Sequence, residues 1–434
     1  MRRGKKVVKR KSSHAIMVCI TKAEHVLWRR YTKRGTMAGK NKKGFHTVED
    51  ADMEEYRQKL REHRRRVWRR TFIIVLVIVL IVAGLGLYMA FRHYEDYDIL
   101  SSVERSDTEA THFAEFHGGI LKYSNDGAFY TDTSNELIWN QTYEMSNPKT
   151  DTCGDYLTIY DKGGTRIYIL TRTQLMGSIE TTMEIEQVCV ASQGTVAVLM
   201  KKDASAYLAL YDREGNNLAE GEIHGENGGY PIAIALSHDA VKLAVSMIDI
   251  HSGSVKTTIA FYNYGSVGQN EIDNCVGVNT YDDMVIPEME FMTNDRMAAF
   301  GDSRVIIFEG AQKPQEVAEI PFEKEAKSIF YNEKYIGVVN SNEDEAVTHH
   351  VSVYDTEGGL IMEKDFGLEY TQIEFLSNNE ICIRNENTCD IYTIRGVYKF
   401  HHEFDQQLYQ VIPGGIGLNY TFVLKDATEK VRLK

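Results

Sequence analysis

Short alternating runs of apolar residues, separated by turn residues, recur at a near-constant interval over residues 111–434. Each unit begins at a Gly, Asp, Glu or Asn turn, enters an apolar run such as Tyr156–Ile159, and continues into a second run. Eight units begin between Gly119 and Gly415, about 42 residues apart on average. This period is typical of four-stranded propeller blades, which stack into a ring because one blade cannot bury both of its faces. The sequence therefore predicts an all-β, WD40-like β-propeller of eight blades.

Turn residues support this repeat. Three tyrosine–aspartate pairs, each followed by a glycine within three residues, close a predicted strand at Asp161, Asp212 and Asp355. Asp and Gly provide the side-chain acceptors and the positive φ angles that hairpin turns require. The pairs resemble weakened forms of the WD dipeptide that closes a strand in WD40 repeats. We therefore predict that these three aspartates are blade-turn residues.

The sequence is compatible with more than one way of closing the ring. The last unit is short, with runs at 416–420 and 421–424 interpreted as two strands, so seven blades plus an irregular strand pair is the alternative. If residues 430–434 form the final strand, closure requires a strand near His112–Phe116 to complete the last blade. A pair of β-sandwiches or a β-solenoid competes with the propeller. The unit spacing, which varies between 35 and 56 residues, argues against a tight solenoid.

A second feature precedes the repeat: Phe72–Phe91 contains no charged residue. About 20 apolar residues at about 1.5 Å per residue span the hydrocarbon core of a bilayer, and only a helix satisfies the backbone of such a single segment there. Some 70 residues precede it, too many for a secretory signal peptide, and no small-residue cleavage site follows. We predict an uncleaved transmembrane helix over residues 71–91.

Flanking charge predicts the orientation of this helix. Residues 1–70 contain 23 Lys and Arg against 7 Asp and Glu, a net charge of +16, whereas residues 71–434 carry −29. A basic cluster directly precedes the apolar segment; it consists of Arg64, Arg65, Arg66, Arg69 and Arg70. The positive-inside rule places residues 1–70 in the cytoplasm and residues 111–434 outside, after an acidic linker at 92–110.

The basic tail has two parts. Residues 49–70 lack Gly and Pro, begin acidic and end basic, which suits a helix dipole and predicts a helix that continues into the membrane. Its basic end is expected to contact anionic lipid headgroups rather than nucleic acid, because no nucleic-acid-binding motif accompanies it. Residues 1–36 mix basic runs with an apolar patch, and a start at Met37 rather than Met1 is our hypothesis for them.

Five of the six cysteines lie in the predicted propeller. Cys382 and Cys389 flank a predicted hairpin turn and are expected to face each other across two strands. The sequence leaves open whether they form a disulfide or remain buried free thiols.

The whole arrangement resembles an uncharacterised family of clostridial-type bacterial single-pass membrane proteins. The resemblance rests on the RRRVWRR junction at 64–70, the ILKYSNDGAFYTD run at 120–132, the LIWNQTYEMSNP run at 137–148 and the YD turns. It covers roughly residues 50–434. It implies a WD40-like or quinoprotein-like propeller of unknown function outside the cell membrane, without an assigned activity.

The chain contains no hydrolase, metalloprotease or phosphate-binding loop motif, so the sequence identifies no catalytic, cofactor-binding or metal-binding residue. We expect a non-catalytic scaffold that binds an envelope protein or a cell-wall component and no cofactor. The strong acidity disfavours polyanionic partners such as nucleic acid. Two alternatives stay open: a propeller-type hydrolase, lyase or quinoprotein-like dehydrogenase, and a ligand-sensing signal transducer.

Overall fold

The computed structural model describes residues 50–105, 111–203, 205–223, 229–251, 253–342, 347–415 and 417–434. It divides into two units, residues 1–84 and residues 85–434, and each is described by itself. The predictions for residues 1–49, including a start at Met37, lie outside the described residues.

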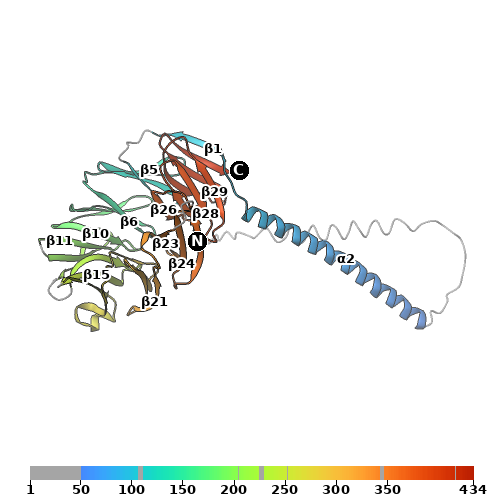
Figure 1. The fold of residues 1–434 in the computed structure, drawn as a ribbon, viewed down its shortest axis with the longest axis horizontal. Coiled ribbons are helices and arrows are strands. Elements are labelled where there is room, and N and C mark those ends of the chain that lie inside the picture. Colours follow the sequence, from blue (N-terminus) through green and yellow to red (C-terminus); the bar gives the residue numbers. More distant parts are fainter. Residues whose placement is uncertain are drawn as a thin grey trace, which may run out of the picture. The chain divides into compact units, whose positions relative to one another are not determined.

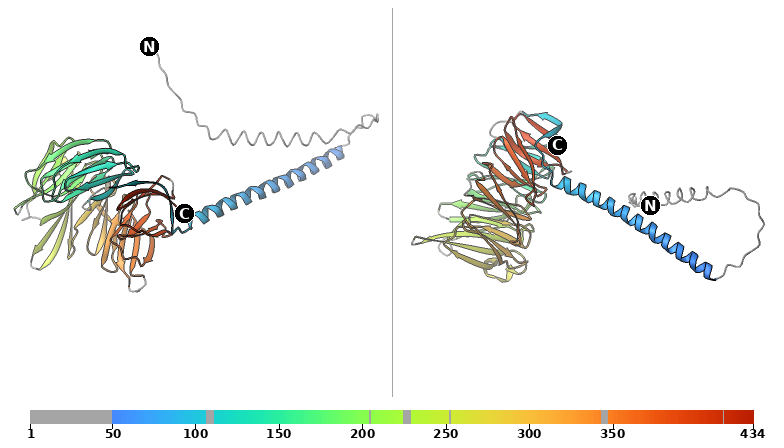
Figure 2. Two further views of the ribbon diagram at one scale, coloured as in Figure 1. Left: turned by 90° about the horizontal axis from the view of Figure 1, so that it is seen from above. Right: turned by 45° about the vertical axis from the view of Figure 1, so that its right-hand side comes forward.

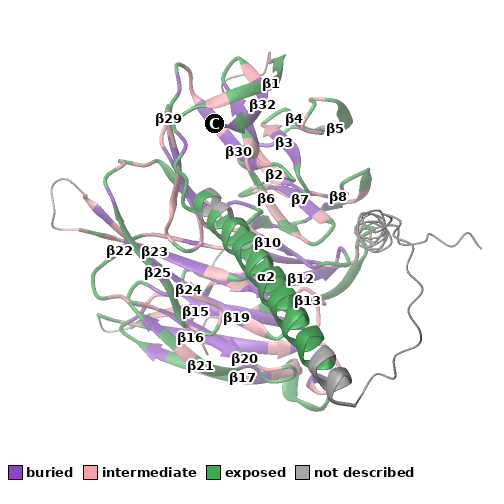
Figure 3. Cartoon of the chain, turned by 90° about the vertical axis from the view of Figure 1, so that its right-hand side faces the viewer, coloured by how far each residue is buried: buried purple, intermediate pink, exposed green. Residues whose placement is uncertain are grey.

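The first element among the described residues is the helix α2 (Asp50–Ala90), labelled in Figure 1. It is continuous over 41 residues, as the sequence predicts for 49–70 and the apolar segment that follows. Within it, Arg57–Gly84 contains an 18-residue window with a mean hydropathy of 2.2, and the segment is long and apolar enough to span a membrane. The five arginines of the basic cluster are exposed on this helix. Figure 3 colours the described residues of this helix as exposed along its length.

Among the described residues, 32 strands form eight antiparallel sheets of four strands each. The predicted eight-bladed propeller is confirmed. Innermost strands of neighbouring blades contact one another, including β2 of the first blade and β30 of the last. Figures 1 and 2 show the sheets following one another in chain order around the ring.

The strands are assigned to blades as follows. Blade 1 contains β2 (His112–Phe116), β3 (Gly119–Ser124), β4 (Gly127–Thr131) and β5 (Leu137–Thr142). Blade 2 contains β6 (Pro148–Cys153), β7 (Tyr156–Asp161), β8 (Arg166–Thr171) and β9 (Leu175–Glu180). Blade 3 contains β10 (Glu184–Val190), β11 (Val196–Lys202), β12 (Ser205–Tyr211) and β13 (Asn217–Ile223). Blade 4 contains β14 (Tyr230–Leu236), β15 (Lys242–His251), β16 (Ser254–Asn263) and β17 (Cys275–Asp282), with the short 3-10 helices η2 (Gly268–Asn270) and η3 (Ile272–Asn274) before β17.

The second half of the ring repeats this order. Blade 5 contains β18 (Glu288–Phe291), β19 (Arg296–Phe300), β20 (Arg304–Glu309) and β21 (Gln315–Pro321). Blade 6 contains β22 (Ala326–Tyr331), β23 (Tyr335–Ser341), β24 (His349–Asp355) and β25 (Leu360–Phe366). Blade 7 contains β26 (Gln372–Phe375), β27 (Ile381–Arg384), β28 (Thr388–Tyr392) and β29 (Tyr398–Glu403). Blade 8 contains β30 (Leu408–Pro413), β31 (Asn419–Leu424), β32 (Ala427–Leu433) and β1 (Tyr97–Glu104).

The ring closes through its N-terminal strand, and two expectations were wrong here. β1 pairs antiparallel with β32, from Tyr97 opposite Leu433 to Glu104 opposite Ala427, so it is the outermost strand of the last blade. Figure 1 shows β1 beside the C-terminal strands. Residues 97–104 are therefore not part of an acidic linker, and His112–Phe116 is the innermost strand of blade 1 rather than the closing strand.

The eighth unit also differs from its predicted form. The runs at 416–420 and 421–424, interpreted as two strands, contribute one strand, β31, which pairs with β30 and β32. The missing strand comes from β1, far away in sequence. The unit is short because only three of its four strands lie at the C-terminal end of the chain.

The core consists of eight hydrophobic clusters, one in each interface between neighbouring blades. The strand β11 shows why: Val196, Val198 and Met200 pack toward blade 2, while Ala197 and Leu199 pack toward blade 4. Alternate side chains of a strand leave opposite faces of the sheet, so a strand buried on both faces is apolar throughout. Figure 3 shows buried residues gathered in the inner strands and exposed ones in outer strands such as β13.

Candidate functional site

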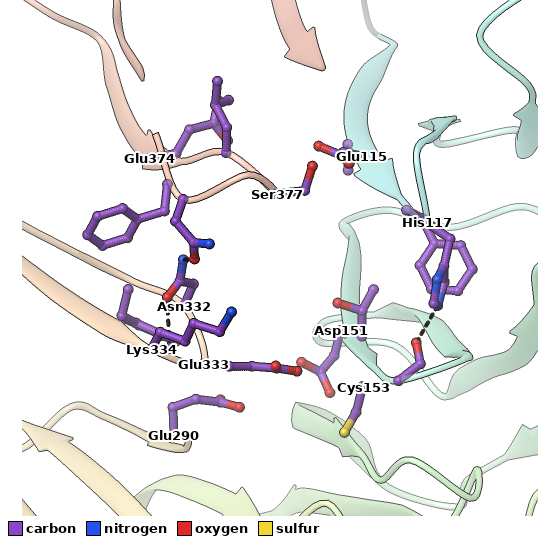
Figure 4. Close-up of a pocket in the computed structure, with 18 of the residues that line it drawn as sticks. Glu115, His117, Asp151, Cys153, Glu290, Asn332, Glu333, Lys334, Glu374 and Ser377 are labelled. Atoms are coloured by element: carbon purple, nitrogen blue, oxygen red, sulfur yellow. Dashed lines mark hydrogen bonds between the residues drawn. The ribbon is translucent and has the colours of Figure 1, made fainter. Parts of the chain in front are cut away.

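A cavity of about 720 Å³ lies within the ring, between the innermost strands. Its walls come from β2, β6, β18, β22 and β26, from the inner turns that follow them, and from His238 and Gln410. A further hollow of about 500 Å³ shares Gly154, His238, Glu333 and Lys334 with it. Both hollows lie at the inner turns, the turns that join the first and second strands of each blade. Figure 4 shows the labelled side chains pointing into the cavity from several blades.

Four blades supply an acidic side chain to this cavity from equivalent positions. Glu115, Asp151, Glu290 and Glu374 each lie one or two residues before the end of an innermost strand. Residues two apart in a strand share a face, which also brings Cys153 to the cavity beside Asp151. Sequence analysis named none of these residues. The signal that could have found them is an acidic residue repeated just before the inner turn.

The carboxyl group of Asp151 is enclosed by protein. The backbone N–H of Val190, on the innermost strand of blade 3, donates a hydrogen bond to Asp151 Oδ2 at 2.6 Å. Burial nevertheless dominates and raises the pKa of Asp151 to about 7, because desolvation penalises the charged form more than the backbone hydrogen bonds stabilise it. Asp151 can therefore gain or lose a proton near neutral pH.

Glu290 lies in the same cavity and makes no hydrogen bond or ion pair to another described residue. Its side chain keeps some surface open to the cavity, yet surrounding protein separates it from bulk solvent. Burial, and then the negative charges of Asp151 and Glu288, raise the pKa of Glu290 well above its ordinary value. Next to it, Tyr331 donates a hydrogen bond from its hydroxyl to Glu288 Oε1 at 2.7 Å.

The other two carboxyl groups have partners. Glu115 receives a hydrogen bond from Ser377, which opposes the effect of burial, but burial still raises the pKa of Glu115. Figure 4 shows these two side chains facing each other. Glu374 Oε1 lies 3.4 Å from the buried guanidinium of Arg384.

Arg384 is itself fixed by three further acceptors, one of which is the carbonyl oxygen of Leu408 at 3.4 Å from Nη1. Its Nη2 donates to Gln372 Oε1 at 2.6 Å and to Gln410 Oε1 at 3.1 Å. The charge of Glu374 is thus balanced within the protein, whereas those of Asp151 and Glu290 are not.

Hydrogen bonds between inner turns hold the mouth of the cavity. His117 Nε2 lies 2.7 Å from the carbonyl oxygen of Gly154, and His238 Nε2 lies 2.7 Å from that of Phe291. Because both partners are acceptors, Nε2 carries the proton in each ring. Asn332 Nδ2 donates to Asn379 Oδ1 at 3.1 Å. Each bond joins an inner turn to the inner turn, or to the end of the innermost strand, of the next blade, so the mouth is organised before any ligand arrives.

No group of three His, Cys, Asp or Glu side chains within the described part of the chain is arranged to hold a metal ion. The acidic groups come from separate blades, and within the described residues no three of them lie close enough together to ligate one ion. This spacing suits a larger, hydrogen-bonding ligand in a cavity whose volume falls in the range of about 300–1,000 Å³ typical of small-molecule sites.

The predicted blade-turn aspartates lie outside this cavity, and they are not equivalent. Asp212 and Asp355 follow the third strand of their blades, and each Oδ1 accepts two backbone N–H groups of its own turn, at 2.8–3.0 Å. Asp132 of blade 1 makes the same pair of bonds and was missed. Asp161 instead ends the second strand of blade 2, where its Oδ1 accepts the N–H groups of Ser146 and Asn147.

The predicted cysteine pair is close but outside the cavity. Cys382 and Cys389 lie on the paired strands β27 and β28, and both are free thiols in this structure. They belong to the cluster between blades 7 and 8. Their disulfide remains a prediction.

Comparison with known proteins places the chain in a family. A family model described as a family of unknown function, DUF5711, matches residues 90–433. The chain belongs to DUF5711. The match begins at the end of α2 and includes β1, in agreement with the strand order of blade 8. No curated protein matches this DUF5711 chain.

Solved structures resemble this DUF5711 chain at low identity. BamB from Moraxella catarrhalis has a TM-score of 0.44 at 12% identity, over 78% of this chain and 100% of that one. Sqt1 from Saccharomyces cerevisiae has a TM-score of 0.45 at 11% identity, over 79% and 100%. The Pan2 WD40 domain from Neurospora crassa has a TM-score of 0.42 at 9% identity, over 79% and 97%. At such similarity no function transfers.

Proposed function

We propose that this chain is a membrane-anchored, non-catalytic binding protein of a clostridial-type bacterium, whose propeller holds a ligand or a segment of an envelope partner in its central cavity. The cavity carries the proposal. It combines a volume suited to a ligand, carboxyl groups contributed by separate blades, and a mouth fixed by hydrogen bonds between turns. Such preorganised concave sites are the usual binding sites of rigid folds.

The anchor and its orientation belong to the same proposal. Arg57–Gly84 is long and apolar enough to cross a bilayer, and the five arginines at 64–70 precede its most apolar part. Positive charge on this side favours a cytoplasmic N-terminus and a propeller outside. A partner in the envelope, either a protein or a cell-wall component, is consistent with that location. The net charge of −29 over residues 71–434 favours a basic partner over nucleic acid.

In-cell cross-linking of the tagged full-length protein, followed by mass spectrometry, tests this function. Thr152 is exposed and lines the cavity, so Thr152→Trp should obstruct it with little effect on folding. Thr173→Trp, on an exposed turn of the same blade, is the matched control. We expect the wild type and Thr173→Trp to capture the same partner or ligand and Thr152→Trp to lose most of it. Equal capture by all three proteins would contradict binding in the cavity.

A propeller-type hydrolase or lyase is the second candidate, because the raised pKa of Asp151 suits general acid–base chemistry near neutral pH. If the cavity is catalytic, the purified full-length protein should convert an envelope-derived substrate pool, and Asp151→Asn should abolish that conversion. A bound substrate that is released unchanged would exclude this candidate.

A further inference from the structure

The cavity contains acidic groups whose charge the protein does not balance. Glu374 has Arg384 as a partner, but Asp151 and Glu290 have no Lys or Arg at hydrogen-bond distance. Among the described lining residues, Lys334 is the single Lys or Arg, and it lies on an exposed turn at the rim. Burying a carboxyl group without a partner is costly, so proteins retain such groups where a ligand or a proton completes them.

The environment of Glu290 is a second indication, besides the number of acidic side chains in the cavity, that a ligand binds there. Its carboxyl is enclosed by protein, makes no hydrogen bond within the described residues, and points into the cavity in Figure 4. Asp151 approaches the same space from blade 2, three blades away from Glu290 in blade 5. The two carboxyls therefore face a shared space from different sides.

We propose that the cavity binds a ligand through a protonated amine, which is seated between the carboxyl groups of Asp151 and Glu290. This inference rests on the proposed binding function and names its ligand class. An ammonium group has three N–H donors and no acceptor, so it can satisfy carboxyl oxygens from several directions. A compact metal ion does not fit, because no group of three ligating side chains converges among the described residues.

Aromatic rings support a cationic ligand over a neutral polar one. Tyr331 and Phe375 line the cavity and are partly exposed to it. The face of an aromatic ring attracts a cation, most strongly where water is excluded. The combination of buried carboxyls with ring faces is suited to an alkylammonium group, such as a lysine side chain of a basic peptide.

Binding at this place requires the release of a proton. Burial keeps the carboxyl groups of Asp151 and Glu290 protonated to higher pH than usual. The titratable side chains that interact with these two carboxyl groups are all acidic or neutral; they are Cys153, Glu288, Tyr331, Glu333, Cys189 and Tyr160. A protonated amine stabilises the carboxylate, so R–NH₃⁺ and a neutral carboxyl give an ammonium–carboxylate pair and one H⁺ in solvent. Binding should therefore tighten as pH rises from 6 toward about 8, below the pKa of an alkylamine.

Isothermal titration calorimetry of the full-length protein in detergent tests this inference. The probes are spermidine and the tripeptide Gly-Lys-Gly with an acetylated N-terminus and an amidated C-terminus, so that the lysine Nζ is its single ammonium group. The matched neutral probe is the same blocked tripeptide acetylated on the lysine Nζ as well. Titration in phosphate and in Tris buffer gives the number of protons released, because the two buffers differ in ionisation enthalpy. We expect release of up to one proton per bound amine at pH 7, and at least tenfold weaker binding of the neutral tripeptide.

Variants assign the effect to the two carboxyls. Glu290→Gln should weaken binding of the amine probes at least tenfold and reduce proton release, whereas Glu220→Gln, on the exposed strand β13, should change neither. Equal affinity for the neutral and charged tripeptides, or no binding of either amine at 10 mM, would overturn the inference. If the amine probes did not bind but Thr152→Trp still abolished partner capture in cells, the proposed binding function would stand without the amine inference. If Thr152→Trp captured as much partner as the wild type, both would be wrong.

Discussion

The Sγ atoms of Cys382 and Cys389 lie 3.6 Å apart across β27 and β28, and both side chains are fully buried. A disulfide needs the two sulfurs at about 2 Å, so the side chains must turn toward each other across a diagonal of the strand pair, in which Cys382 is opposite Ile391 and Cys389 is opposite Arg384. Outside the membrane the environment favours oxidation. The pair therefore reports on the compartment of the propeller as well as on its packing.

We predict that protein purified from its native membrane without reductant contains the Cys382–Cys389 disulfide. Closing an eight-residue loop contributes about 2.5 kcal/mol in the chain-entropy model, so reduction should lower Tm by a few degrees. Non-reducing peptide mapping by mass spectrometry detects the link, and Cys275, which is partly exposed, serves as the unlinked control. Complete alkylation of both cysteines in denaturant without reductant would show that they are free.

Asp151 should make the propeller less stable at neutral than at acidic pH. Its pKa is raised to about 7 in the folded protein, so folding favours its protonated form. Below about pH 4 the residue is protonated in both states and has no effect. Between about pH 4 and pH 7 the unfolded chain loses the proton first, so stability falls as pH rises, and above pH 7 the loss is complete.

The measurement is Tm at pH 5 and pH 7.5 for the wild type and for Asp151→Asn, whose side-chain oxygen can still accept from Val190. We expect Tm of the wild type to fall by several degrees more than that of the variant over this interval. Carboxyl groups with lowered pKa act in the opposite direction, but they are common to both proteins and cancel in the comparison. Parallel curves would refute the role given to Asp151.

The closing strand offers a test with a matched control. The ring of Tyr97 packs against Phe422 and Phe404, with ring centroids 5.2 and 6.0 Å apart, whereas Leu100 on the same strand is 59% exposed. Tyr97→Ala should lower the free energy of unfolding by about 2–4 kcal/mol, and Leu100→Ala by less than about 0.5 kcal/mol. Chemical denaturation of the full chain measures both. Equal, small effects would mean that residues 97–104 behave as a linker.

The arginine cluster should control the orientation of the chain. A cysteine placed at Val278, which is 59% exposed, should react with a membrane-impermeant maleimide in intact cells, once Cys153 and Cys275 are replaced by serine. Changing the five arginines to asparagine should reduce this labelling by roughly half or more, since loss of positive charge weakens retention of the N-terminus inside. Mass spectrometry at position 278 reads the label. Labelling only after cell lysis in the unmodified chain would reverse the proposed topology.

The second and third strands of most blades could be predicted from sequence because they are buried on both faces. A strand such as Tyr156–Asp161 packs against two neighbours and is therefore an almost continuous apolar run. These runs, with the turns between them, were enough to predict eight blades. Asp212 and Asp355 were found because each follows a Tyr and has a Gly three residues later. Asp132 was missed because it follows Thr131 and has Asn135 at the positive-φ position of its turn.

The innermost strand of blade 2 was missed because it has no apolar pattern. Pro148–Cys153 reads PKTDTC and has no apolar alternation, since its side chains meet the cavity rather than a hydrophobic neighbour. Asp151 and Glu290 are 139 positions apart in the sequence, and they line one cavity only because the ring closes. The closing strand was missed for a related reason: its partner β32 lies at the opposite end of the chain.

Site-specific photo-cross-linking in living cells tests the central claim, that the cavity is the binding site, most directly. A photoreactive phenylalanine analogue at Glu333, exposed at the mouth of the cavity, is compared with the same residue at Val278, exposed on the outer strand β17. We predict a discrete adduct from position 333 that an excess of the bound ligand or partner removes, and none from position 278. Adducts of equal yield at both positions, or from position 278 alone, would contradict the account.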